Sequence, residues 1–188
     1  MFPMSYVRGF LPWIVLAIAS SVFGWQWGAV AAFAAGVVLL SQDRRAGRQP
    51  GELELGGLTY FLALALLAFV APHSPLEAYD GALSSAWLAV IAGVGLAMGR
   101  PFTLAIARRS VDERTARHPM FLHINTVITA VWAASFATTA LLGATCVALG
   151  EPEPMRIAVQ ALGFAVPAMF TRAYVARIEG RRGALAAA

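Results

Sequence analysis

Residues 82–99, ALSSAWLAVIAGVGLAMG, form a run without a single charged side chain, and Arg100 and Pro101 follow it directly. A helix needs about 20 apolar residues to cross the hydrocarbon core of a bilayer. Proline cannot continue a helix without a kink, so this run is expected to end just before it. The stretch therefore predicts a transmembrane helix that stops at a charged membrane interface.

Five further apolar runs lie on either side of this stretch. Together with it they predict six transmembrane spans, at about 9–24, 26–42, 57–72, 82–99, 120–149 and 155–175. Of the 188 residues, 59% are apolar and only 13% are charged, which is too apolar for an ordinary soluble domain. The spans take up most of the chain, so we expect no extramembrane domain. The predicted fold is all-α, a bundle of six transmembrane helices that forms a single domain over residues 1–188.

The fourteen basic residues are all arginines, and thirteen of them fall in alternate gaps between the apolar runs. Arg156 is the exception. Short loops on the cytoplasmic side of a membrane carry an excess of Arg and Lys. The pattern predicts a multi-pass membrane protein with both termini in the cytoplasm. The segments assigned to the cytoplasmic side carry a net charge of +7 and those on the other side −3, which together give the +4 of the whole chain. The expected partners are the bilayer and its anionic lipid headgroups, and no nucleic acid.

Residues 102–109, FTLAIARR, follow the proline break. Phe102, Ala105 and Ile106 have the i, i+3, i+4 spacing of one helix face, and paired arginines close the segment. This pattern predicts a short amphipathic helix that lies on the cytoplasmic leaflet. The alternative is that the segment extends the helix of residues 82–99 beyond a kink.

Polar residues at the predicted ends of the last two spans form the main candidate site. In the fifth span, Asn125, Thr129, Trp132 and Phe136 share one helical face. A polar side chain at this depth must face a neighbouring helix or a cavity, because an unpaired group in lipid is costly. The polar face therefore predicts one of two arrangements. The first is a polar pocket open to the cytoplasm, and the second is a set of hydrogen bonds between helices, with arginines that reach to the membrane interface. The candidate pocket comprises Arg100, His123, Asn125, Thr129, Gln160, Thr171 and Arg172.

Signatures of catalysis, of a cofactor and of a metal site are not found in the sequence. It has no P-loop and no HExxH motif, Cys146 is its only cysteine, and no second ligand is spaced to help any of its three histidines. We therefore expect no enzyme activity, no cofactor and no metal. Small residues recur every four positions, as at Gly28, Ala32 and Gly36, which predicts close packing inside the bundle or, alternatively, a homodimer face.

Four short motifs resemble the intracellular septation protein A family of bacterial inner-membrane proteins. They are Phe10-Leu11-Pro12, Arg100-Pro101-Phe102, Phe121-Leu122-His123-Ile124-Asn125 and Ala130-Val131-Trp132-Ala133. The resemblance as a whole covers about a third of the chain. An uncharacterised branch of related small membrane proteins is the other possibility. The resemblance implies a multi-spanning protein of the bacterial inner (plasma) membrane that is tied to envelope integrity and division, without an established catalytic activity. Only Arg100-Pro101, Asn125 and Trp132 match positions of the family pattern.

The leading functional hypothesis is a non-enzymatic protein of the cell envelope that acts through contacts with other membrane proteins. The alternative is a channel or transporter for a small solute or ion, with a cavity lined by Asn125, Thr129, Gln160 and Thr171. Secondary active transport is disfavoured because the central parts of the spans carry no Asp, Glu or Lys. A lipid-modifying enzyme is a third possibility, although no nucleophile and base can be paired from the sequence.

Overall fold

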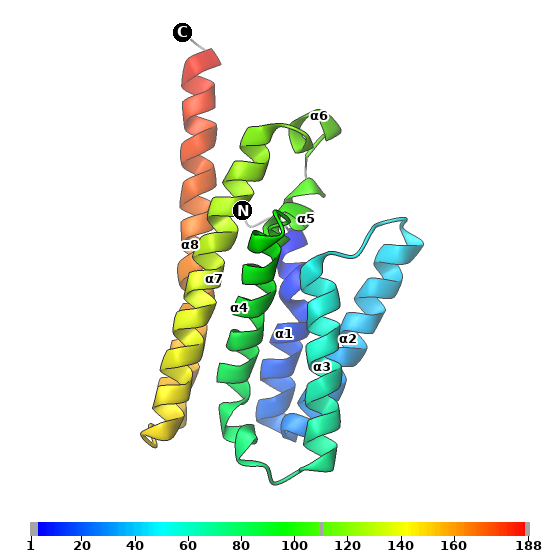
Figure 1. Ribbon diagram of the computed structural model, residues 1–188, viewed down its shortest axis with the longest axis vertical. Coiled ribbons are helices and arrows are strands. Elements are labelled where there is room, and N and C mark those ends of the chain that lie inside the picture. The colour runs from blue at the N-terminus through cyan, green and yellow to red at the C-terminus, as the bar shows by residue number, and fades with distance from the viewer. Residues whose placement is uncertain (1–3, 110, 187–188) are drawn as a thin grey trace.

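The computed structural model describes residues 4–109 and 111–186, and this part of the chain consists of helices joined by short connections, with no strand (Figure 1). Helix accounts for 86% of the chain, which confirms the all-α fold. The elements are α1 (Met4–Phe23), α2 (Trp25–Arg45), α3 (Glu52–Val70), the 3₁₀ helix η1 (Pro75–Tyr79), α4 (Asp80–Ala97), α5 (Phe102–Arg108), α6 (Glu113–Ala116), α7 (Pro119–Ala148) and α8 (Glu153–Ala186).

Six long helices in the described residues, α1, α2, α3, α4, α7 and α8, overlap the six predicted spans. Four of the segments are long and apolar enough to cross a membrane, namely α2, α3, η1 with α4, and α7. The described apolar part of α1, Arg8–Phe23, is shorter. In α8 the apolar run is interrupted by Gln160, Pro167 and Arg172. A membrane location is thus supported, and crossing by α1 and α8 remains a prediction.

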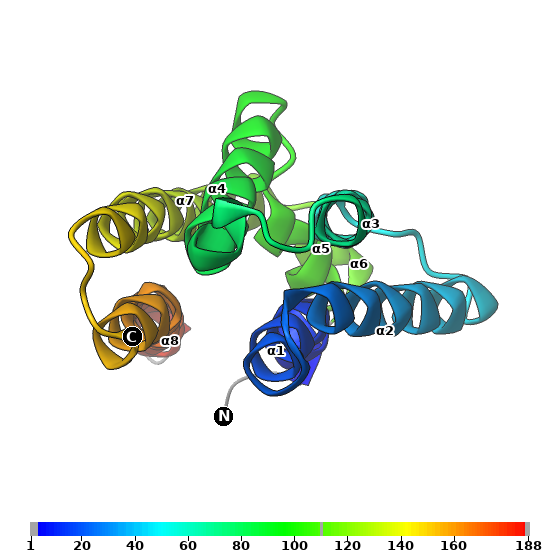
Figure 2. The same ribbon diagram turned by 90° about the horizontal axis from the view of Figure 1, so that it is seen from below.

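The long helices form two groups of three. In the first group α2 packs along both α1 and α3, and in the second α7 packs along both α4 and α8. Viewed along the bundle, the groups stand side by side with α5 between them (Figure 2). At one end α7 and α8 extend beyond the other long helices (Figure 1). The 30 residues of α7 give a length of about 45 Å, well beyond the span of a bilayer core.

The same end of the bundle carries most of the arginines, and we call it the arginine-rich end. There α1 and α3 begin, α2 and α4 end, α5 and α6 lie, α7 begins and α8 ends (Figure 1). Arg8, Arg44, Arg45, Arg100 and Arg108 belong to these helix ends. The side chains of Arg181 and Arg182 lie outside the described residues. We call the other end, with the α1–α2, α3–α4 and α7–α8 connections, the opposite end.

Helix α5 forms where a helix was predicted, but its apolar face does not lie on a leaflet. Phe102, Thr103, Leu104 and Ile106 are all at most 7% exposed, since α5 packs against α1, α4 and α7. The chain turns into this position at Gly99, which has a φ of 69° and caps α4. The Arg100 amide donates to the Gly95 carbonyl oxygen at 2.7 Å, a bond typical of such caps. The amphipathic pattern was correct, but protein covers the apolar face in place of lipid.

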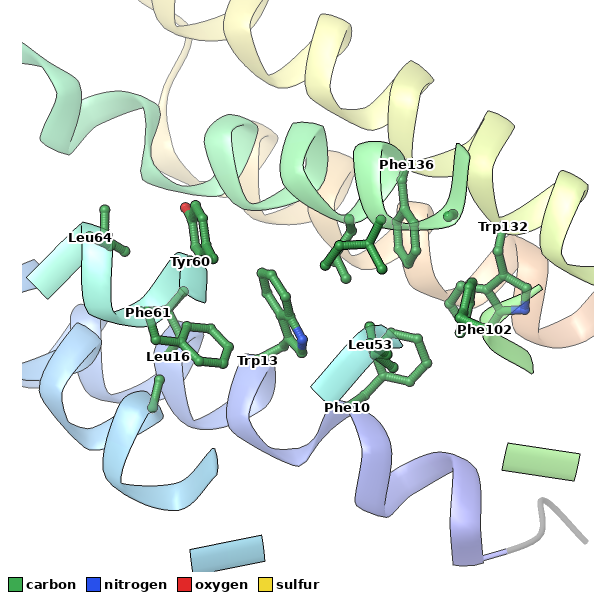
Figure 3. Packing of buried hydrophobic residues seen from close by; sticks show 14 of the residues in the cluster. Phe10, Trp13, Leu16, Leu53, Tyr60, Phe61, Leu64, Phe102, Trp132 and Phe136 are labelled. Carbon is green, nitrogen blue, oxygen red and sulfur yellow. The ribbon is translucent and has the colours of Figure 1, made fainter. Parts of the chain in front are cut away.

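Aromatic side chains fill the seam between the two groups of helices. Phe10 of α1 stacks on Trp132 of α7 with ring centroids 5.1 Å apart, and the edge of Phe102 meets Phe10 at 6.1 Å. Nearer the opposite end, Trp13 of α1 stacks on Tyr60 of α3 at 5.3 Å (Figure 3), and Tyr60 stacks in turn on Trp87 of α4 at 6.0 Å. Because stacked and edge-on rings add to the gain from burial, this cluster joins the two groups along the seam.

Candidate functional site

Asn125 and Thr129 lie at the point where α5 contacts α7. Both side chains are buried, and the Thr129 hydroxyl is 2.7 Å from that of Thr103 on α5. Thr103 also donates to the backbone oxygen of Asn125 at 3.0 Å, and Asn125 Nδ2 donates to the backbone oxygen of Phe121 at 2.8 Å. Asn125 Oδ1 is buried and has no hydrogen-bond donor among the described residues. These residues therefore form a packed junction between helices, with one unused acceptor.

Thr171 of α8 belongs to a second hydrogen-bonded group, around Trp132. The indole Nε1 of Trp132 donates to the Thr171 hydroxyl at 3.1 Å, and that hydroxyl donates to the backbone oxygen of Pro167 at 2.7 Å. Proline has no N–H, so Pro167 leaves the carbonyl oxygen of Gly163 without its usual helical donor. Ser135 of α7 supplies one at 2.9 Å. A break in the helix ladder of α8 is thus used to attach α8 to α7.

Gln160 lies further along α8, toward the opposite end. Its Oε1 accepts from Ser85 of α4 at 3.2 Å, and its Nε2 is 3.0 Å from the same hydroxyl. Eleven residues separate Gln160 from Thr171, which corresponds to about 16 Å along the helix axis. The two side chains therefore belong to different levels of the bundle.

The charged members of the predicted pocket are exposed, with Arg100, His123 and Arg172 all on the surface. The structure thus divides the seven predicted residues among a buried junction, two helix-to-helix bonds and the surface. It does not gather them around one cavity. Asn125, Thr129, Trp132 and Phe136 do share one buried face of α7, as their spacing predicted. The spacing identified the face, while the hydrogen-bond partners come from Thr103, Pro167 and Ser85, which the sequence did not link to these residues.

An ion cluster around Asp43, at the arginine-rich end, was not predicted. Asp43 is only 2% exposed. Its carboxylate lies 3.1 Å from Arg8, 3.3 Å from Arg48 and 3.5 Å from Arg109. Arg109 also donates to Glu54 at 2.7 Å. The cluster joins α1, the end of α2, the loop after it, the start of α3 and the end of α5. In the sequence Asp43 stands beside Arg44 and Arg45 and near a loop, and this position predicts a side chain exposed to solvent.

A small cavity adjoins the ion cluster between α1, α2 and α3. Its volume is about 20 Å³, and Arg8, Asp43 and Glu54 line it together with Trp13, Leu39 and Leu58. A buried space of this size holds about one water molecule. At this cavity, charged side chains meet a hollow in the apolar part of the bundle.

Comparison of the chain with protein-family models, with curated proteins and with solved structures gives no match.

Proposed function

We propose that this protein is a multi-pass protein of the bacterial inner membrane that takes part in cell-envelope maintenance or septation. It would act without catalysis, as the resemblance to the septation protein A family implies, and through contacts with other membrane proteins. The proposed topology has six spans, with the arginine-rich end and both termini in the cytoplasm. The support for this topology is the distribution of arginines over alternate loops.

The observation that favours a contact protein is the use of its buried polar side chains. Thr103 bonds to Thr129, Trp132 to Thr171, Ser85 to Gln160 and Tyr60 to Ser84, each pair joining two different helices. Such bonds fix the relative positions of the helices. A transport path or a catalytic site needs polar groups that face a cavity or a substrate. A rigid bundle suits a protein whose outer faces are recognised by partners.

Two apolar stripes offer surfaces for such contacts. Ile14, Ile18 and Val22 are exposed along one face of α1. Leu162, Val166 and Met169 are exposed with i, i+4, i+7 spacing on α8. Lipid covers these stripes when no partner is bound, so association depends on complementary packing and small gains in contact.

Photo-crosslinking in living cells tests this proposal. A photoreactive amino acid replaces Ile18 on α1 or Leu162 on α8, and a matched control replaces Leu66, which is exposed on α3. We expect crosslinks to division or elongation proteins of the inner membrane from one stripe and not from the control. Equal crosslinking from all three positions, or a protein that stays monomeric and without adducts, would contradict it.

The alternative is a channel or transporter for a small solute or ion. Two observations favour it: the division into two three-helix groups, which suits a rocking motion, and the unpaired Oδ1 of Asn125 near the seam. A rocking transporter opens the seam to water in one of its states. Cysteines introduced at Thr129 and Thr171, in a Cys146→Ala background, would then react with a small water-soluble thiol reagent. We expect them to stay unreactive, and reaction at both sites would favour the transporter.

A further inference from the structure

Helix α8 carries a stripe of apolar and small residues on the side that faces away from the bundle. The inward side of α8 is already in contact, since Gln160 bonds to α4, Phe164 packs on Phe10 of α1 and Thr171 bonds to α7. On the outward side, residues recur at alternating intervals of four and three, which is the a/d spacing of a heptad. Within the predicted span this stripe comprises Met155, Val159, Leu162, Val166 and Met169.

The part of the stripe inside the membrane is exposed. Its members other than Val159 are between 49% and 71% exposed. Lipid tails are as apolar as these side chains and can cover them, so this part of the stripe does not distinguish lipid from protein. The continuation of α8 beyond the predicted span does distinguish them.

The stripe keeps its spacing to the end of the predicted span and past it, where lipid no longer covers the helix. Three exposed residues continue the alternating intervals: Ala173, Ala176 and Gly180. The charged residues of the same segment lie beside the stripe and not on it: Arg172, Arg177 and Glu179. An uncharged stripe between charged flanks is typical of the seam of a coiled coil.

The last turns of α8 gain no support from the rest of the bundle. They reach beyond the other elements (Figure 1), and from Arg172 to Gly180, where the side chains are described, none is buried. Isolated helices shorter than about 12–15 residues are marginal in water. Gly180 and Gly183 each cost about 1 kcal/mol relative to alanine in a helix interior. This segment is therefore expected to be stably helical only when another helix covers the stripe.

A second copy of this chain fits the stripe. Two copies with the same orientation in one membrane present α8 in parallel and at the same depth, so equivalent a and d positions meet in register. The stripe from Met155 to Gly180 is about 38 Å long and about 10 Å wide, which gives a contact of roughly 400 Å² per copy. A standard stable interface takes about 800 Å² per partner, so the expected dimer is reversible.

We propose that α8 pairs with α8 of a second copy as a parallel coiled coil along this stripe, and that the protein forms a reversible homodimer. The proposal rests on the proposed function, because it uses the same topology and names the occupant of one of the two apolar stripes. The stripe on α1 stays free for a different membrane protein.

Cysteine scanning from Arg172 to Gly180 tests the pairing in native membranes. Each variant of the full-length protein also carries Cys146→Ala, and a mild oxidant links cysteines that meet between copies. We expect disulfide-linked dimers to peak at positions 173, 176 and 180 and to be weak at 174, 175 and 178. Equal linkage at all positions would indicate random collision, and a scan without dimers would exclude the pairing. Either result overturns the proposal.

A charge reversal tests the direction of the two helices. Parallel pairing places Arg172 at a g position beside the partner's Arg177 at an e position, and these two like-charged pairs weaken the dimer. Arg177→Glu converts both into attractive pairs. We expect the dissociation constant of the dimer to fall by roughly three- to tenfold, as measured by energy transfer between labelled copies in liposomes. Arg45→Glu, at the exposed end of α2, is the control and should leave it unchanged. An unchanged or larger dissociation constant for Arg177→Glu overturns the parallel pairing.

Photo-crosslinking separates this proposal from the proposed function. If two copies pair through α8, adducts formed at Leu162 have twice the mass of the chain, whereas adducts formed at Ile18 contain a different protein. Adducts with a different protein but no disulfide-linked dimers would overturn the homodimer and leave the contact function standing. Dimers at positions 173, 176 and 180 without any adduct to another protein would support the homodimer and contradict the contact function.

Discussion

The hydroxyl of Thr103 lies 2.7 Å from the hydroxyl of Thr129, which joins the short helix α5 to the first half of a long apolar helix, α7. Thr103 and Thr129 are both fully buried. Helix α5 is therefore an internal element of the bundle, wedged between the two groups of three helices at the arginine-rich end. Because α5 lies inside the bundle, Arg109 at the end of α5 reaches both Asp43 and Glu54 of the ion cluster.

Thr103→Val tests how strongly this bond holds α5 in place. Valine has nearly the same shape, but it removes the Thr103 hydroxyl and leaves the buried hydroxyl of Thr129 without its partner on α5. We expect the free energy of unfolding to fall by about 1–2 kcal/mol. Thermal or SDS-induced unfolding of the purified protein measures it. Thr126→Val is the control, since Thr126 is exposed and bonds only to Leu122 of its own helix. The double variant Thr103→Val/Thr129→Val should lose less than the sum of the single variants.

Asp43→Asn tests the ion cluster. The substitution keeps the size of the side chain but leaves Arg8, Arg48 and Arg109 around a neutral group. Removing one member of a buried ion pair is strongly destabilising, and partial solvent contact of Arg8 and Arg48 reduces the effect. We expect a loss of roughly 2 kcal/mol or more. In Glu113→Gln the exposed pair with Arg117 is broken instead, which should change the stability by less than about 0.5 kcal/mol. Equal effects of the two substitutions would refute a structural role for the cluster.

Periodicity explains which parts of this fold could be predicted. The apolar runs located all six long helices, and the spacing of Asn125, Thr129, Trp132 and Phe136 identified the buried face of α7. The same reasoning found α5 but not its surroundings, because a helical stripe does not say whether lipid or protein covers it. The burial of Asp43 depends on arginines from three other segments. The residues that follow Asp43 in the sequence are Arg44 and Arg45, and both are exposed. The local sequence therefore does not indicate that Asp43 is buried.

Gly28→Ala tests the closest approach between two helices of the first group. A Cβ at this position would lie 2.7 Å from the backbone nitrogen of Ser20 and 2.8 Å from its Cα. Backbone atoms cannot move aside as the end of a side chain can, so α1 and α2 must separate. We expect a loss of about 1–3 kcal/mol of stability. Gly93→Ala meets no neighbour and should be neutral or slightly stabilising, because alanine favours a helix. A similar result for both variants would mean that α1 and α2 do not pack this closely.

Reporter fusions at the two termini decide whether α1 and α8 cross the membrane. If only α2, α3, α4 and α7 cross, both termini lie on the same side as the α1–α2 and α7–α8 connections. If α1 and α8 also cross, both termini lie on the other side, with the arginine-rich end. A protein that fluoresces only in the cytoplasm and a phosphatase active only outside it distinguish these outcomes. We expect cytoplasmic termini, because the arginines of α8 and Arg8 of α1 would otherwise face away from the cytoplasm. Phosphatase activity at either terminus would show that the adjoining helix does not span.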